Sequence, residues 1–474
     1  MSDRKKKIID TYNKIFKNWD FWKSRNTYYH ENDLKYLKFL IPENKKILDL
    51  GCGTGYKLNA LKPSNGIGID FNNYAIKEAN KNFKNLKFYC FDVENKNYLK
   101  KINEKFDYIL ISDLLGDLED VGEFLKNLQS FCNKETRIVT SNYSTLWWPF
   151  LKITEFFKLK IPTVDKNWLR GKDIENFFEI NKFQIIKNER KILLPKKFFG
   201  IGNLINRFIA TLPIIDKLCL STYIVSRSVA YNEKKKYSTS LIVPCKNEKG
   251  NISLIIKRIP KFCEDLEIIF VEGGSSDGTY EEIKKVKKEN KDFDIKVFKQ
   301  DSLGKANAVI KGFKEAKNEI LMILDADMTV PPEVLTKFYE LYCNGTGEFI
   351  NGSRMVYPLE KDSMRFLNIL GNFVFSKIFT WLLRQRFTDT LCGTKVLSKS
   401  DFKKIEKSCK YFGNFDPFGD FLLIFGAVKE NLKIVELPIK YKKRVYGTTQ
   451  ISRFKHGIIL FKMVIFAYFK IKAI

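Results

Sequence analysis

The sequence has few of the residues that build zinc sites, disulfide frameworks and histidine-dependent catalytic triads. It contains two histidines, His30 and His456, and its nine cysteines include no C-x-x-C pair. Zinc sites and triads that depend on histidine are therefore not expected. An odd number of scattered thiols is typical of a reducing compartment, so we expect a cytoplasmic protein.

Long apolar runs are also missing. No stretch of about 18 uninterrupted apolar residues occurs, which argues against a conventional membrane-spanning helix. Residues 1–5 lead into no apolar segment of the kind that forms the core of a signal peptide, so we expect none.

Positive charge, in contrast, is in large excess. The chain has 83 Lys and Arg against 55 Asp and Glu, a formal net charge of +28. This balance indicates an anionic partner: nucleic acid, acidic lipid headgroups or phosphorylated small substrates. The 474 residues, 44% of them hydrophobic, are sufficient for globular folding and too many for one core. About two to four domains are therefore expected.

The first half repeats a short strand followed by an acidic residue. Strands are predicted over residues 46–50, 66–69, 86–91 and 106–111, and polar groups follow them: the loop Gly51–Gly55, Asp70, Asp92 and Asp113. Glycines let the backbone approach a ligand closely, and an acid about 20 residues later can accept hydrogen bonds from ribose hydroxyls. NAD is a rival ligand, but its loop is G-x-G-x-x-G whereas this one is G-x-G-x-G.

With these motifs, residues 40–145 resemble the class I S-adenosylmethionine-dependent methyltransferases. The resemblance implies S-adenosylmethionine as cofactor, with Asp49 and the glycine loop beside its methionine part, Asp70 at its ribose and Asp92 at its adenine. The implied cofactor-binding residues are Asp49, Gly51, Gly53, Gly55, Asp70, Asp92 and Asp113. No general base stands out and the methyl acceptor is not identified. A cofactor-binding module that does not methylate is the alternative.

An aromatic and basic section from residue 147 to about 230 follows. Residues 182–186 predict a last strand of the first domain. We interpret the apolar segment 198–220 as a helical lid over the acceptor site or as a patch that rests on a membrane, with burial against the first domain as the competing interpretation. The polar run 232–237 is the predicted domain boundary.

The second half is organised around Asp325 and Asp327, which follow a predicted buried strand at 320–324. Ligands of open α/β sheets bind beyond the carboxyl ends of the strands, and two carboxylates on one turn suit Mg²⁺ or Mn²⁺ holding a diphosphate. An acidic turn that caps the next helix is the plainer alternative. Further strands are predicted over 240–243, 266–271 and 295–298, and Gly304-Lys305 opens a helix whose N-terminus attracts phosphate.

In this order, the motifs between 238 and 455 resemble family 2 glycosyltransferases of the GT-A fold, and among them the polyprenyl-phosphate sugar transferases of the dolichol-phosphate mannose synthase type. The resemblance implies a nucleotide-sugar site of Pro244, Asn247, Glu248, Glu272, Asp277, Lys305 and Asp325, with Asp325 and Asp327 as metal ligands. It implies Asp420 and Asp389 as catalytic acids, and Arg354, Arg444, Ser452 and Arg453 as ligands of an acceptor phosphate. The chain departs from the pattern at Glu272-Gly273, where many relatives have two acids, and at Gln450, where lysine is common.

Two basic and apolar stretches indicate interfacial helices. Apolar residues recur at helical spacing over 366–382, and residues 457–469 are apolar except for Lys462. We expect both helices to lie on an anionic membrane surface, with packing of the first against the domain core as the alternative.

The sequence thus predicts an α/β chain of two Rossmann-like domains with C-terminal amphipathic helices. A methyltransferase-like domain with its lid is expected over 1–232, a GT-A domain over 238–455 and an interfacial tail over 456–474. The predicted function is inverting, metal-dependent transfer from a nucleotide-sugar to a polyprenyl phosphate, together with methyl transfer, in surface glycan biosynthesis at the cytoplasmic membrane. The alternative is transfer to a saccharide hydroxyl with a scaffolding first domain. A nucleic-acid partner is not expected, because we find no recognition module.

Overall fold

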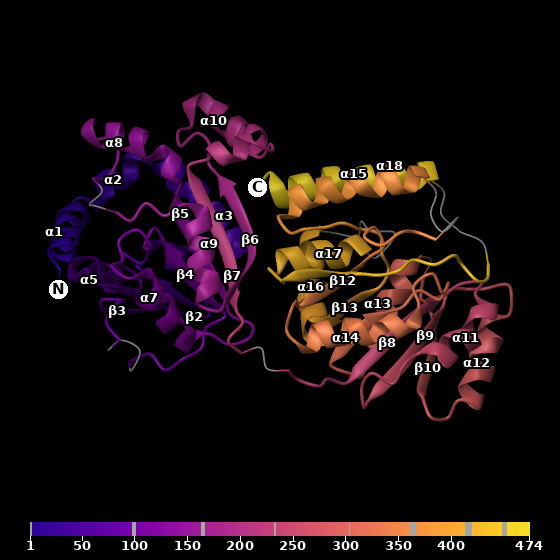
Figure 1. The fold of residues 1–474 in the computed structure, drawn as a ribbon. Coiled ribbons are helices and arrows are strands. Elements are labelled where there is room, and N and C mark those ends of the chain that lie inside the picture. Colours follow the sequence, from indigo (N-terminus) through magenta and orange to yellow (C-terminus); the bar gives the residue numbers. More distant parts are fainter. Residues whose placement is uncertain are drawn as a thin grey trace. The chain divides into compact units, whose positions relative to one another are not determined.

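The computed structural model describes residues 2–96, 101–162, 166–231, 234–302, 304–360, 366–412, 420–447 and 453–474 (Figure 1). The chain divides into two compact units, the first up to Tyr231 and the second from Asn232 to Lys472. Each unit is built on a seven-stranded sheet. Within the described ranges, no helix is long and apolar enough to cross a membrane.

The first unit has a mostly parallel sheet of order β3-β2-β1-β4-β5-β7-β6, in which β7 runs antiparallel to β5 and β6. The apolar runs predicted as strands form its centre, with Ile47, Leu48 and Leu50 fully buried. The strands are β1 (Lys46–Leu50), β2 (Asn65–Asp70), β3 (Lys87–Cys90), β4 (Tyr108–Ser112), β5 (Arg137–Tyr143), β6 (Phe183–Lys191) and β7 (Ser221–Ser228).

Helices cover this sheet and extend beyond one end of it (Figure 1). The charged N-terminal segment is helical. The helices are α1 (Asp3–Lys17), α2 (Trp19–Arg25), α3 (Thr27–Leu40), α4 (Tyr56–Ala60), α5 (Asn73–Asn82), α7 (Val121–Leu128), α8 (Trp148–Phe156), α9 (Gly171–Ile180) and α10 (Ile201–Leu204).

The second unit has a mixed sheet of order β10-β9-β8-β11-β13-β12-β14. β13 is antiparallel to β11 and β12, and the other pairs are parallel. Its strands are β8 (Thr239–Cys245), β9 (Leu266–Glu272), β10 (Asp294–Lys299), β11 (Ile320–Ile323), β12 (Phe349–Ser353), β13 (Lys395–Ser398) and β14 (Ile434–Pro438). Its helices are α11 (Lys249–Arg258), α12 (Thr279–Glu289), α13 (Lys305–Glu315), α14 (Leu335–Cys343), α15 (Phe366–Leu383), α16 (Lys399–Phe412), α17 (Asp420–Lys429) and α18 (Arg453–Ala467).

The two predicted interfacial segments form α15 and α18, which lie side by side (Figure 1). One face of α15 packs on the domain, where Phe379 stacks on Phe421 with ring centroids 5.2 Å apart. The other face exposes Leu370 and Phe373, and α18 exposes Phe461. Packing against the domain core is therefore confirmed for one face of α15, and membrane contact of the other face stays a prediction.

The segment 198–220 is built of short helical turns, and its role as a lid or as a patch that rests on a membrane stays a prediction. Its competing interpretation, burial against the first domain, is wrong for most of its apolar side chains. Phe199, Leu204 and Ile214 are all exposed. A pattern of apolar residues gives no information about whether the protein supplies enough surface to cover them.

Candidate functional sites

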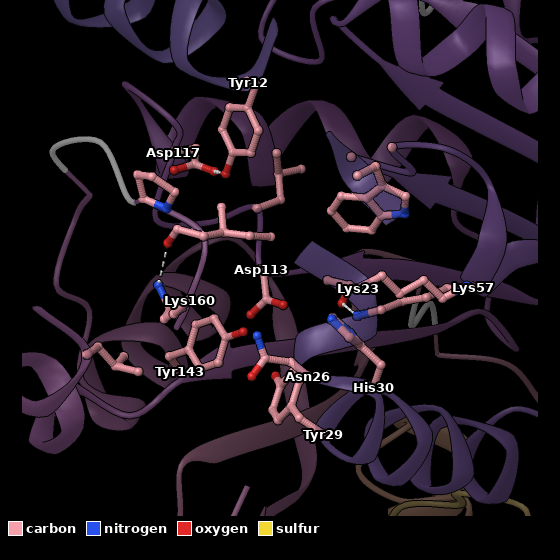
Figure 2. Close-up of a pocket in the computed structure, with 18 of the residues that line it drawn as sticks. Tyr12, Lys23, Asn26, Tyr29, His30, Lys57, Asp113, Asp117, Tyr143 and Lys160 are labelled. Atoms are coloured by element: carbon pink, nitrogen blue, oxygen red, sulfur yellow. Dashed lines mark hydrogen bonds between the residues drawn. The ribbon is translucent and has the colours of Figure 1, made fainter. Parts of the chain in front are cut away.

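A cavity of about 320 Å³ lies at the carboxyl ends of β1, β2 and β4 in the first unit (Figure 2). The predicted residues Asp49, Gly51, Gly53, Asp70 and Asp113 all line it. Gly51 and Gly53 have φ angles of +77° and +53°, a region that side chains disfavour, so the sharp loop after β1 requires glycine at these positions. The strand-end pattern of the sequence therefore converges on one cavity.

Asp49 is a buried carboxylate with unused hydrogen-bonding capacity. Its side chain is 1% exposed, and in the described part of the chain no donor reaches Oδ1. Burial raises the pKa of Asp49 to about 7, although Lys57 nearby favours the ionised form. A ligand that brings a cationic or hydrogen-bonding group to this position would satisfy the carboxylate, and S-adenosylmethionine, which carries an ammonium and a sulfonium, fits that requirement.

Asp70 shapes the glycine loop from the end of β2. Its Oδ2 accepts from the Gly53 amide at 2.9 Å and its Oδ1 from the Asn72 amide at 2.8 Å. Burial raises the pKa of Asp70 to about 6, and these two amide donors oppose the rise. Each carboxylate oxygen keeps a second lone pair for a ligand hydroxyl.

Two predicted cofactor residues do not line this cavity. Gly55 packs against the ring of Phe88, which leaves no room for a side chain there. Asp92 forms an ion pair with Lys5 of α1, with Lys5 Nζ 2.5 Å from Asp92 Oδ2. The role of Asp92 at the adenine stays a prediction, and it would require this ion pair to open or rearrange.

A polar network beside the cavity was not predicted from the sequence. Lys57 Nζ lies 2.7 Å from Asp33 Oδ2 and donates to the Ser112 hydroxyl at 2.5 Å, and the Tyr223 hydroxyl donates to Asp33 at 2.7 Å. Burial opposes the charge of Lys57, but Asp33 and Asp113 raise its pKa above the ordinary value. Asp113, at φ +57°, lies beside this network.

His30 is a functional candidate that sequence reasoning missed. It lines the cavity beside Lys23 and Lys57, opposite Asp113 (Figure 2). Burial, together with Lys57, lowers the pKa of His30 to about 4, so the imidazole is neutral at pH 7 and has a nitrogen able to accept a proton. The one available signal was the scarcity of histidine, which says nothing about position.

In the second unit, Asp325 follows β11 and is held by a lysine from a neighbouring helix. Lys305 Nζ, at the first residue of α13, lies 2.5 Å from Asp325 Oδ1. Burial opposes ionisation of both groups, but each stabilises the other's charge: the pKa of Asp325 is lowered and that of Lys305 raised. Gly393 packs directly on this pair, and a Cβ there would collide with the Asp325 carboxylate.

Arg444 joins Asp327 to Glu248. Its Nη2 donates to Asp327 Oδ2 at 2.8 Å and its Nη1 to Glu248 Oε1 at 2.7 Å. Asp327 Oδ1 also accepts from the amide and hydroxyl of Thr329. The segment that contains Arg444 therefore lies over residues that were predicted to bind the nucleotide and metal.

Asp389 and Arg354 form a buried forked ion pair. Nε and Nη2 of Arg354 donate to the two carboxylate oxygens at 2.6 Å and 2.9 Å, and Asn372 Nδ2 donates to Oδ1 at 2.9 Å. Burial disfavours the carboxylate, but Arg354 lowers the pKa of Asp389 to about 2. Asp389 is fully buried, so in this structure its carboxylate holds Arg354 in place.

Asp420, at the start of α17, is paired with a lysine of β13. Lys395 Nζ, which is fully buried, donates to Asp420 Oδ1 at 2.6 Å. This pair belongs to the same cluster as the others, because Lys395 and Arg354 stabilise the charge of Asp325, and Asp420 stabilises that of Lys305. The predicted catalytic and metal-binding acids are therefore brought together, each against a cation.

The loops after β8 and β9 interlock at the predicted nucleotide site. The Asn247 amide donates to the Ser275 hydroxyl at 2.9 Å, and the Ser276 amide donates to Asn247 Oδ1 at 2.9 Å. Glu272 accepts from the Ser275 amide, and Asp277 accepts from the amides of Lys249 and Thr279. Pro244 is half-buried in β8 just before this loop. Ser452 lies outside the described residues, and the side chain of Arg453 is likewise not described.

The donor set around Asp325 and Asp327 suits a metal only in part. Among the described residues, no group of three or more His, Cys, Asp or Glu side chains is arranged to hold a metal ion. Two carboxylates are nevertheless a common protein contribution to a Mg²⁺ site in which phosphate oxygens and water complete the shell. The residues therefore fit a metal that arrives with a diphosphate, not one bound by protein alone.

Two family models match the chain. Residues 41–182 match the family described as a methyltransferase domain, and residues 240–405 match glycosyl transferase family 2. The chain carries a methyltransferase domain followed by a family 2 glycosyltransferase domain. The predicted pair of families and the α/β fold class are therefore confirmed.

Two curated proteins are each similar to somewhat less than half of this chain. A dolichol-phosphate mannosyltransferase of Pyrococcus furiosus is 29% identical over 220 residues, which is 45% of this chain and 59% of that protein. A UDP-N-acetylglucosamine–dolichyl-phosphate N-acetylglucosaminyltransferase of Methanococcus voltae is 28% identical over 237 residues, 47% of this chain and 92% of that protein. The chain thus spans little more than half the length of the first relative. A solved S-adenosylmethionine-dependent methyltransferase from Thermotoga maritima has 14% identity and a TM-score of 0.35, over 46% of this chain and 99% of that one.

Proposed function

We propose that the glycosyltransferase domain moves a sugar from a nucleotide-sugar to a polyprenyl phosphate, and that the methyltransferase domain moves a methyl group from S-adenosylmethionine. The observation that carries the first activity is the cluster of acid–cation pairs beyond β11, centred on Asp325 and Lys305. The names of the two relatives support a polyprenyl-phosphate acceptor. Both activities would serve the assembly of a membrane-linked surface glycan on the cytoplasmic side of an anionic membrane.

In this proposal Asp325 and Asp327 hold Mg²⁺ or Mn²⁺ together with the diphosphate of the donor. The metal, when bound, supplies electrostatic stabilisation of the charge on the leaving diphosphate. Lys305 adds a fixed positive charge at the N-terminus of α13, where backbone amides also attract phosphate. Arg444 must then give up Asp327, and it becomes available to contact phosphate.

The ion pairs of Asp389 and Asp420 favour a phosphate acceptor over a saccharide hydroxyl. A lipid phosphate is already an oxyanion and needs orientation, whereas a hydroxyl must lose its proton to a general base. Asp389 is occupied by Arg354, and Asp420 by Lys395. We assign both acids to positioning: Asp389 fixes Arg354 for the acceptor phosphate, and Asp420 fixes the floor beside Asp325.

In the methyltransferase domain, Asp49 and Asp70 hold the cofactor and His30 accepts the proton that the acceptor loses. S-adenosylmethionine supplies an already activated methyl group, so the protein has mainly to position the acceptor and exclude water. The orphaned Oδ1 of Asp49 is the observation that supports cofactor binding. The observation that supports His30 is its position, because its imidazole lines the cavity that contains Asp49 and Asp70.

The test is the transfer of radiolabelled sugar from candidate nucleotide-sugars to a short polyprenyl phosphate, with Mg²⁺ or Mn²⁺ present. We expect label in the organic phase, lost in Asp325→Ala and retained in Asp292→Ala, which removes an exposed acid before β10. Label confined to water-soluble saccharide would contradict the lipid-phosphate acceptor and favour the saccharide alternative. Calorimetry with S-adenosylmethionine followed by a methyl-transfer assay tests the first domain, and binding without turnover would favour a scaffold.

A further inference from the structure

Most of the large apolar side chains that the methyltransferase domain exposes lie on two segments. We call this surface the apolar face, formed by residues 146–159 around α8 and residues 198–218 around α10. Its exposed members are Leu146, Trp148, Phe150, Ile153, Phe156, Phe157, Leu159, Phe198, Phe199, Ile201, Leu204, Phe208, Ile209, Leu212, Ile214 and Leu218. Phe156 and Phe199 are 83% and 107% exposed, far more than a stably folded domain requires. So many exposed large apolar side chains on two segments indicate a site of interaction.

The two segments lie together at one end of the domain. The Trp147 indole donates to the Leu218 carbonyl at 2.7 Å, which joins them directly. The junction of α2 and α3 holds both, since Arg25 donates to the Lys158 carbonyl at 2.9 Å and Lys196 donates to the Arg25 carbonyl at 2.7 Å. Figure 1 shows α8 and α10 at the same end of the methyltransferase domain.

The first segment also lines the cofactor cavity, through Trp147, Leu151 and Leu159. The second segment contributes no lining residue itself, but Pro195 and Leu220, which flank it on either side, line the same cavity. Phe150 is both an exposed member of the apolar face and part of the cavity lining. Whatever covers the apolar face therefore lies next to the reaction space.

The charges around this face have one sign. Lys158 and Lys217 are exposed on the two segments, and Lys197 is exposed just before the second. The acids in these segments are neutralised or buried, since Glu155 pairs with Lys152 and Lys160 at 3.2 Å, and Asp216 is 4% exposed. An apolar surface with a basic rim is complementary to the interface of an anionic bilayer, where side chains enter the acyl boundary and lysines meet headgroups.

We propose that the apolar face seats the methyltransferase domain on an anionic membrane, and that the methyl acceptor is a membrane-borne amphiphile whose head enters the cavity between the two segments. This contact is separate from that of α15 and α18 in the glycosyltransferase domain. The second part of the proposal rests on the proposed methyl transfer. The first part does not.

The membrane contact is tested by sedimentation of the full chain with vesicles of phosphatidylcholine and phosphatidylglycerol. Phe156→Glu/Phe199→Glu should lower the partition coefficient by at least about tenfold, because two exposed rings are removed from the interface. Ile180→Glu, at a 70% exposed position on α9, is the matched control and should bind like the unaltered chain. Binding should also weaken on pure phosphatidylcholine and at high salt.

Retention of full vesicle binding by Phe156→Glu/Phe199→Glu would overturn the proposal. With vesicle binding unchanged, two other results for this variant would also overturn the proposal. One is a change from dimer to monomer, and the other is greater protease cleavage between the two domains. Those results would mean that a second copy or the other domain covers the face. Phe373→Glu/Phe461→Glu separates the contribution of α15 and α18, and the quadruple variant should bind least.

The acceptor class is tested with methyl-labelled S-adenosylmethionine and a chloroform–methanol extract of cell membranes, compared with the aqueous extract. We expect label in the chloroform phase, reduced at least about tenfold in Phe156→Glu/Phe199→Glu, with cofactor binding by calorimetry unchanged. Label in the aqueous phase would overturn the acceptor class. Absence of cofactor binding in the unaltered chain would instead refute the proposed methyl transfer and leave the vesicle result standing.

Discussion

Replacing Asp49 with asparagine should stabilise the ligand-free protein and weaken cofactor binding. Asp49 is 1% exposed, and no donor in the described part of the chain reaches its Oδ1, so its negative charge is poorly compensated when the cavity holds no ligand. Asparagine has the same shape without the charge. The cost of the buried carboxylate is therefore removed while the packing stays as it is.

The magnitude follows from the pKa of Asp49, which burial raises from 3.8 to about 7. The native state holds its proton more tightly than the unfolded state, so the free energy of unfolding falls as pH rises from about 4 to 7. A pKa difference of about three corresponds to a loss of about 4 kcal/mol. Asp49→Asn should escape this loss: it should match the unaltered chain near pH 4 and exceed it by up to about 4 kcal/mol at pH 8.

The assay is urea unfolding of the full chain between pH 4 and 8, with hydrogen exchange of peptides that contain β1 to localise the effect. Asp10→Asn, at an exposed position of α1, is the control and should leave the profile unchanged. Affinity for S-adenosylmethionine should fall about tenfold or more in Asp49→Asn, because a hydrogen bond to a charged group is lost. Equal or lower stability of Asp49→Asn at pH 8 would refute the argument that the cavity stores an uncompensated charge.

Three further outcomes follow from the contacts of the two sites. Asp389→Ala should lower the free energy of unfolding measured in urea by about 3–5 kcal/mol, because Arg354 is left buried and unpaired; a loss below about 1 kcal/mol would contradict the buried pair. Gly393→Ala should abolish sugar transfer while cofactor calorimetry is unchanged, because the new Cβ meets Asp325; an active variant would show that the loop can move aside. His30→Gln should slow methyl transfer by about 10²- to 10⁴-fold at constant cofactor affinity, and an unchanged rate constant would exclude the imidazole as base.

Much of the fold was predictable because parallel strands are buried on both faces and therefore appear as apolar runs. The runs at 46–50, 266–271 and 320–324 all form central strands, and the acids that follow them lie at the same sheet edge. Asp70 and Asp325 were predictable as site residues for this reason. Their position depends only on where a strand ends.

The partners of those acids were not predictable, since they come from distant segments of the chain. Asp327 meets Arg444, 117 residues away, and Asp420 meets Lys395 through the crossing of α17 and β13. His30 reaches the cofactor cavity from a helix that precedes every strand. No local pattern encodes these contacts, because tertiary packing alone decides which side chains of a helix meet a given strand end.

Both sites contain acidic residues at the ends of strands, but the two sites differ in whether these acids are paired with cations. In the methyltransferase domain no donor among the described residues reaches Asp49 Oδ1, so binding of a ligand that carries positive charge relieves an existing cost. In the glycosyltransferase domain Asp325, Asp389 and Asp420 each already have a cation, and an anionic ligand gains from cations that are fixed before it arrives. S-adenosylmethionine carries positive charge, as the first site requires, and a nucleotide diphosphate is anionic, as the second site requires. The unpartnered carboxylate oxygen of the first site and the cations already in place in the second therefore support the assignment of one substrate to each domain.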